Sequence, residues 1–118
     1  MNQTIAKAVG VALVLLASVA TAQDAAVVNP KTVHVTLDNA RVRVLEATLP
    51  PGEREQMHSH PASVVYVIAG GKIRNHFADG TVKESELATG ATLYRDPITH
   101  WAENIGSTPI HLILTELK

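Results

Sequence analysis

The chain has 118 residues, a formal net charge of −1 and no cysteine. This length suits one domain, and the lack of cysteine excludes disulfides and thiolate chemistry. Because no basic run occurs in the sequence, we expect no binding to nucleic acid or to anionic membrane surfaces.

Residues 1–22 have the pattern of an export signal. Lys7 and the amino terminus supply positive charge, residues 8–20 are almost all small or apolar, and Ala20-Thr21-Ala22 fits the cleavage rule. The apolar run is shorter than the roughly 20 residues of a membrane-spanning helix, so the alternative is an uncleaved anchor at the membrane surface. We predict cleavage after Ala22, a periplasmic or secreted location, and no membrane contact after cleavage.

The remaining chain is rich in β-branched residues, and turn residues divide it into about nine short strands. We predict a flexible leader over residues 23–31 and one barrel domain over residues 32–118. Strands are expected at 32–37, 41–49, 63–69, 72–78, 81–88, 91–95, 99–104 and 109–117, and one more strand contains His58 and His60. No helix is predicted in this part of the chain. The regular spacing of the strands predicts an all-β sandwich or barrel.

Two strands have unusual patterns. The alternation of apolar and polar residues changes phase near Val44 and Leu45, which indicates a β-bulge. Residues 63–69 are almost continuously apolar, and we therefore expect that strand to be covered on both faces.

His58 and His60 form a His-x-His pair within a predicted strand. Side chains two apart on a strand share one face and lie about 6 to 7 Å apart. Imidazole is a common ligand of transition metals, and His100 could supply a third. The pair alone is more typical of exposed histidines on a polar strand face, and the surrounding motifs reverse this preference in favour of a metal site.

The spacing around this pair resembles the first cupin motif. Five residues separate Gly52 from His58, three residues separate His60 from Val64, and six residues separate Val64 from Gly71. The second cupin motif is similar to the stretch that contains Gly90, Pro97, His100 and Asn104. The resemblance implies a double-stranded β-helix, or jelly-roll barrel, with a metal bound between the two motifs.

The chain departs from the cupin pattern at the ligands. Val64 stands where the family has a glutamate ligand, and the second motif lacks the glycine between Pro97 and His100. The resemblance therefore implies three ligands, His58, His60 and His100, a set similar to that of the thiol dioxygenases and of a diketone-cleaving dioxygenase. We predict one divalent transition metal, which could be Fe, Zn, Ni, Cu or Mn.

Strand alternation places further side chains relative to this site. If His58 and His60 point inward, Gln56 points inward with them and Glu55 points outward. Val64 and Tyr66 are expected on the inner face of the following strand, and Asn104 shares the face of His100. Gln56, Val64, Tyr66 and Asn104 are thus candidates to contact the ligands or line the pocket. The three other histidines, His34, His76 and His111, are expected at exposed positions. Trp101 is expected on the outside or at an interface.

Three function classes remain open from the sequence. The first is a metal-dependent dioxygenase of a small molecule. The second is a non-redox isomerase or lyase that acts on a carbohydrate-like or carboxylate substrate. The third is a cupin that binds metal or a small ligand without turnover. Because strand 32–37 has an exposed edge and cupins commonly dimerise, we also predict a homodimer.

Overall fold

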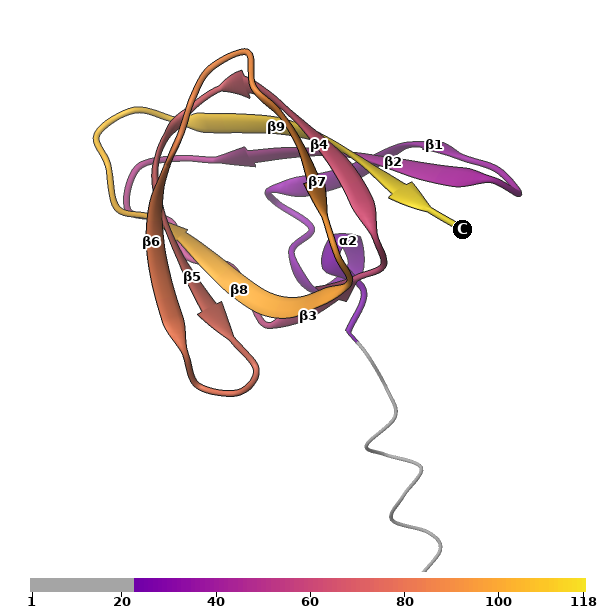
Figure 1. The fold of residues 1–118 in the computed structure, drawn as a ribbon, viewed down its shortest axis with the longest axis horizontal. Coiled ribbons are helices and arrows are strands. Elements are labelled where there is room, and N and C mark those ends of the chain that lie inside the picture. The colour runs from indigo at the N-terminus through magenta and orange to yellow at the C-terminus, as the bar shows by residue number, and fades with distance from the viewer. Residues whose placement is uncertain (1–22) are drawn as a thin grey trace, which may run out of the picture.

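The computed structural model describes residues 23–118, which contain nine strands and one four-residue helix (Figure 1). The elements are α2 (Ala25–Val28), β1 (Val33–Asp38), β2 (Val42–Leu49), β3 (His58–His60), β4 (Ser63–Ala69), β5 (Gly71–Phe77), β6 (Val82–Leu87), β7 (Thr92–Arg95), β8 (Ile98–Asn104) and β9 (Ile110–Leu117). Each predicted strand is present, and where bounds were predicted they differ from the observed ones by at most one residue.

The strands form two antiparallel sheets that face each other across the barrel (Figure 1). One sheet has the order β1-β2-β9-β4-β7 and the other has the order β3-β8-β5-β6. This arrangement is the predicted all-β, double-stranded β-helix. Strands that are distant in the sequence become neighbours in it, and β3 with β8 is the pair that matters for the site.

The apolar core consists of two clusters inside the barrel. Ala25, Val33, Leu45, Val65 and Leu114 form one, and Leu49, Ile73, Ala102 and Ile110 form the other. Leu112 packs against both clusters and joins them. Full burial of a large aliphatic side chain contributes about 1.5 to 3 kcal/mol, so the two clusters provide the main stabilisation of the barrel.

The predicted bulge lies opposite the predicted position. In the ladder between β1 and β2, Val35 pairs with Leu45 and Leu37 pairs with Val44, so the extra residue is Thr36 of β1. The ladder between β2 and β9 is regular through Val44 and Leu45. The phase change in the sequence of β2 therefore reflects a bulge in its partner strand β1.

The prediction that β4 is covered on both faces was wrong. Val65 and Val67 are buried, whereas Val64, Tyr66 and Ile68 on the opposite face are 37%, 46% and 39% exposed. The strand therefore alternates in the ordinary way, and its outer face is apolar but uncovered within residues 23–118.

The predicted flexible leader is an ordered part of the domain. Asp24 caps α2 by accepting a hydrogen bond from the backbone N–H of Ala26 at 2.9 Å. The side chain of Asp24 also forms an ion pair with Arg43 at 2.6 Å, and Ala25 is fully buried in the core. The export signal predicted for residues 1–22 lies outside the described residues. No helix within residues 23–118 is long and apolar enough to cross a membrane.

Candidate metal centre

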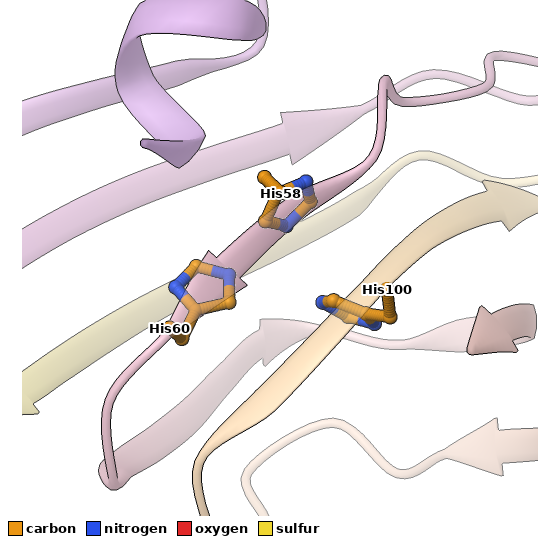
Figure 2. Close-up of side chains that lie close together, drawn as sticks. All are labelled: His58, His60 and His100. Carbon is orange, nitrogen blue, oxygen red and sulfur yellow. The ribbon is translucent and has the colours of Figure 1, made fainter. Parts of the chain in front are cut away.

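Three histidines meet at one end of the barrel interior. β3 carries His58 and His60, and β8 carries His100 directly opposite His58 in the ladder. The ring centroid of His58 lies 4.7 Å from that of His60 and 4.8 Å from that of His100. Figure 2 shows the three rings projecting from these neighbouring strands toward a common region. One ligand nitrogen of each ring lies within 4.8 Å of the other two, and all three residues are buried.

A hydrogen bond at Nδ1 orients each imidazole. The acceptors are the backbone carbonyl of Gln56 for His58 at 2.7 Å, a carboxylate oxygen of Glu116 for His60 at 2.6 Å, and the side-chain oxygen of Asn75 for His100 at 2.8 Å. When Nδ1 donates its proton to these acceptors, the lone pair of Nε2 is free on every ring. The hydrogen-bond pattern thus fits three ligands that bind through Nε2.

Burial keeps two of these histidines neutral. It lowers the pKa of His58 to about 4 and that of His100 to about 2, because the charged imidazolium loses its hydration. Neutral imidazole is the form that binds a metal ion. The Nε2 atom of His100 is buried without a hydrogen-bond partner among the described residues, and such an atom is rare unless an ion or ligand satisfies it. The donor set therefore fits a transition metal.

Glu116 links His60 to the surface of the barrel. One of its carboxylate oxygens accepts from His60, and the other accepts from Nε of Arg43 at 2.8 Å. Burial alone would raise the pKa of Glu116, but the hydrogen bonds from His60 and Arg43 outweigh it and lower that pKa. A charged carboxylate at Nδ1 fixes the tautomer of His60 and makes Nε2 a stronger ligand.

A cavity of about 40 Å³ adjoins the three histidines. Its walls are mainly apolar side chains of β2, β5 and β9, and its polar end contains Glu55 and Arg95 as well as the histidines. Burial raises the pKa of Glu55 to about 7, despite a hydrogen bond from the N–H of Ala102 at 3.0 Å. A carboxylate oxygen of Glu55 lies 3.8 Å from Nε2 of His58. The cavity therefore brings a carboxyl group beside the three candidate ligands.

The predicted orientations of Glu55 and Gln56 were wrong. Arg54 forms an isolated β-bridge with Glu103, and His58 pairs with His100. From the first pair to the second there are four residue steps in the segment before β3 but only three in β8. One extra residue reverses the faces, as a β-bulge does. Glu55 consequently points into the cavity and Gln56 is exposed, although the backbone carbonyl of Gln56 still orients His58.

The other pocket candidates lie elsewhere. Val64 and Tyr66 point outward from the barrel, because β4 directs Ser63, Val65 and Val67 inward instead. Asn104 is buried as predicted, but its amide nitrogen donates to the carbonyls of Leu49 and Thr108 at 2.9 and 2.8 Å. Asn104 therefore holds the loop between β8 and β9, and does not line the cavity of the histidines.

The remaining histidines and Trp101 do not join the site. His34 is exposed, and His111 contacts Glu46 at 2.6 Å near the surface. His76 stacks on Trp101 with a centroid distance of 3.6 Å, and the guanidinium of Arg54 lies 4.8 Å from the Trp101 ring. This partly exposed stack is separate from the three-histidine cluster.

Sequence reasoning missed five residues that shape the site. They are Asn29, Glu55, Asn75, Arg95 and Glu116. Asn75 and Glu116 lie on β5 and β9, and only the pairing of the strands brings them near the histidines. For Glu116, a charged residue within an apolar strand was the available signal.

Solved structures with the same fold support this description. A cupin domain from Bordetella pertussis is 28% identical, with a TM-score of 0.67, and the match covers 73% of this chain and 91% of that one. An RmlC-like cupin family protein from Methanocaldococcus jannaschii, with a double-stranded β-helix fold, is 17% identical with a TM-score of 0.59, covering 72% and 77% of the two chains. A Klebsiella pneumoniae protein with a double-stranded β-helix domain is 24% identical with a TM-score of 0.55, covering 70% and 72%.

No protein-family model matches the sequence, and a comparison with curated proteins finds no match. The structural matches establish the cupin fold. Together with the three-histidine group, they support a metal-binding cupin.

Proposed function

We propose that the chain binds one divalent transition metal through Nε2 of His58, His60 and His100 and oxygenates a small molecule there. The observation that carries the proposal is the convergence of three buried imidazoles whose Nδ1 atoms are all hydrogen-bonded. Three neutral ligands leave coordination positions open. A bound metal would supply a Lewis acid and, in the case of iron or copper, one-electron redox chemistry.

The protein side chains define what else can happen at the site. His60 and His100 are held by side chains on other strands and His58 by the nearby carbonyl of Gln56, so the ligand geometry is fixed before a metal binds. The apolar walls of the cavity exclude bulk water from the reacting groups. Its small volume restricts the site to small substrates or to the reacting end of a longer one.

Glu55 favours a second candidate, a non-redox isomerase or lyase. Its pKa of about 7 allows the carboxyl group both to accept and to donate a proton near neutral pH. A carboxyl group 3.8 Å from a candidate ligand is well placed to move a proton on a substrate held beside it. In this case turnover would change the substrate without consuming oxygen.

The metal assignment is tested by metal analysis of purified wild type and single variants. His58→Ala, His60→Ala and His100→Ala should each lose most of the metal, because two imidazoles hold a divalent ion much less tightly than three. His34→Ala, His76→Ala and His111→Ala are the controls and should keep the wild-type content. Full occupancy in His100→Ala would contradict the proposed ligand set.

Oxygen uptake across a panel of small molecules then separates the function classes. Uptake by the wild type that is abolished in His100→Ala supports a dioxygenase. A product formed without oxygen uptake supports the isomerase or lyase. Ligand binding without any product would assign the site to binding alone.

We further propose that the protein acts outside the cytoplasm after cleavage behind Ala22. The support is the composition of residues 1–22. Cell fractionation and amino-terminal sequencing of the native protein test this, and an intact Met1 in the cytoplasmic fraction would contradict it.

A further inference from the structure

Arg95 carries a half-buried cation that the metal site itself does not require. It is the last residue of β7, and it lines the same cavity as the three histidines. It also borders an open surface depression of about 450 Å³ formed by residues 77–79 and 96–99. Arg95 therefore stands between this depression and the cavity of the candidate metal ligands.

The side chain of Arg95 has two unsatisfied donors. Nε and Nη2 are both shielded from solvent, and neither has a hydrogen-bond partner within residues 23–118. Buried donors without partners are rare and costly, especially on a charged group. Nε–H and one N–H of Nη2 lie along one edge of the guanidinium plane. This edge can bind a carboxylate through two parallel hydrogen bonds.

The neighbouring carboxylates do not fill this role. Glu55 and Glu116 attract Arg95 through space, but among the described residues neither lies within 4.0 Å of its nitrogen atoms as an ion pair. An oxygen of Glu55 accepts from Ala102, and both oxygens of Glu116 are used by His60 and Arg43. The guanidinium edge is thus left for a group from outside.

We propose that Arg95 binds the carboxylate of the substrate, with Nε and Nη2 each donating to one of its oxygens. This inference rests on the proposed function, since the rest of the substrate would face the three histidines in the same cavity. The apolar walls and the small volume fit a short organic acid. A divalent ion on three neutral imidazoles would add to the positive potential that attracts such an anion.

The experiment titrates acetate, and acetamide as its uncharged counterpart, into zinc-loaded and metal-free wild type, with binding measured by calorimetry. Acetate should bind the zinc-loaded protein, and acetamide should bind about 10- to 100-fold more weakly, because charge-assisted hydrogen bonds are lost. Arg95→Met should weaken acetate binding by a similar factor at unchanged zinc content. Arg95→Lys keeps the charge but not the paired donors, so its loss should be intermediate. The exposed Arg41→Gln is the matched control and should behave as wild type.

Thermal unfolding of the metal-free proteins provides the second readout. Arg95→Met removes buried donors that have no partner, so it should melt at or above the temperature of the wild type. A structural arginine would behave in the opposite way, and a large drop in melting temperature would overturn the proposal.

Acetate affinity in Arg95→Met equal to that of wild type would also overturn it, as would equal affinities of the wild type for acetate and acetamide. If the wild type bound no zinc, the proposed function would fail by itself. The metal-free titration would then still decide whether Arg95 binds the carboxylate.

Discussion

The three candidate ligands are held by three chemically different acceptors. His58 donates to a backbone carbonyl, His100 donates to an amide oxygen, and His60 donates to the carboxylate of Glu116. A hydrogen bond to a charged acceptor is roughly twice as strong as one to a neutral acceptor. His60 should therefore be the most firmly oriented of the three ligands.

A substitution at Val64 checks the corrected face of β4. Because Val64 is 37% exposed on the outer face, Val64→Glu should change the free energy of unfolding by no more than about 0.5 kcal/mol. Its metal content and metal preference should equal those of the wild type, since the new carboxylate lies outside the barrel. Urea unfolding and metal analysis measure both.

The neighbouring Val65→Glu is the matched comparison. Val65 is 2% exposed within the core, so this variant should lose several kcal/mol or fail to fold. If Val64→Glu were equally damaging, the outward orientation of Val64 would be wrong.

At the scale of elements, the strands were predictable because their signals are local. Alternation and turn residues lie within each segment, so all nine strands could be placed without knowing their neighbours. Helix α2 was missed because four residues are too few to show helical periodicity, although the capping residue Asp24 was visible in the sequence.

The orientation of side chains was predictable only within regular strands. His58, His60 and His100 could be assigned from motif spacing and parity, and they do share one interior region. Glu55 could not, because the extra residue before His58 reverses the faces and depends on the pairing with β8. Arg95 lies at the end of a short strand, where no pattern in the sequence shows that its side chain turns inward.

Helix α2 should act on the site through Asn29. The side chain of Asn29 accepts from the backbone N–H of Gln56 at 2.7 Å and lies 3.2 Å from Nδ1 of His58. Asn29→Ala leaves that backbone N–H without its partner, so the free energy of unfolding should fall by about 1 to 3 kcal/mol. Metal affinity should fall about tenfold or more, because His58 loses part of its support.

Val27→Ala serves as the control on the same helix. Because Val27 is 73% exposed, this substitution should change neither the free energy of unfolding nor the metal affinity appreciably. Urea unfolding and competition with a metal chelator measure the two effects. Wild-type values in Asn29→Ala would show that residues 23–31 do not support the site.

At the scale of the whole molecule, the barrel places His58, His100 and Glu55 around one cavity. In the metal-free protein these groups make stability depend on pH. The pKa values of His58 and His100 lie well below the ordinary 6.5, so between pH 6.5 and 4.5 the unfolded chain holds up to two protons on these histidines that the folded chain lacks. Glu55, with its pKa raised from 4.5 to about 7, holds one proton in the folded chain over the same range.

With two extra protons on the histidines of the unfolded chain and one on Glu55 of the folded chain, the unfolded chain binds about one proton more than the folded chain. The free energy of unfolding of the metal-free protein should therefore fall with decreasing pH by about 1.4 kcal/mol per unit, or about 3 kcal/mol from pH 6.5 to 4.5. Urea unfolding at a series of pH values measures this slope. Glu55→Gln removes the opposing proton and should roughly double the slope. A flat profile in both proteins would contradict the burial of the two neutral histidines.

The assembly of the molecule follows from its open edges. β1 pairs only with β2 in its sheet, and Val35 and Leu37 on β1 are 45% and 50% exposed. An edge strand with apolar side chains and unpaired backbone groups favours pairing with a second chain. We therefore propose a homodimer in which the β1 edges of two copies meet.

Light scattering should report a dimer for wild type and a monomer for Val35→Lys, because a lysine on the edge opposes pairing. Val82→Lys, at a 53% exposed position on β6 at the edge of the other sheet, is the control and should remain dimeric. A monomeric wild type, or a Val35→Lys protein that dimerises as wild type does, would rule out this interface.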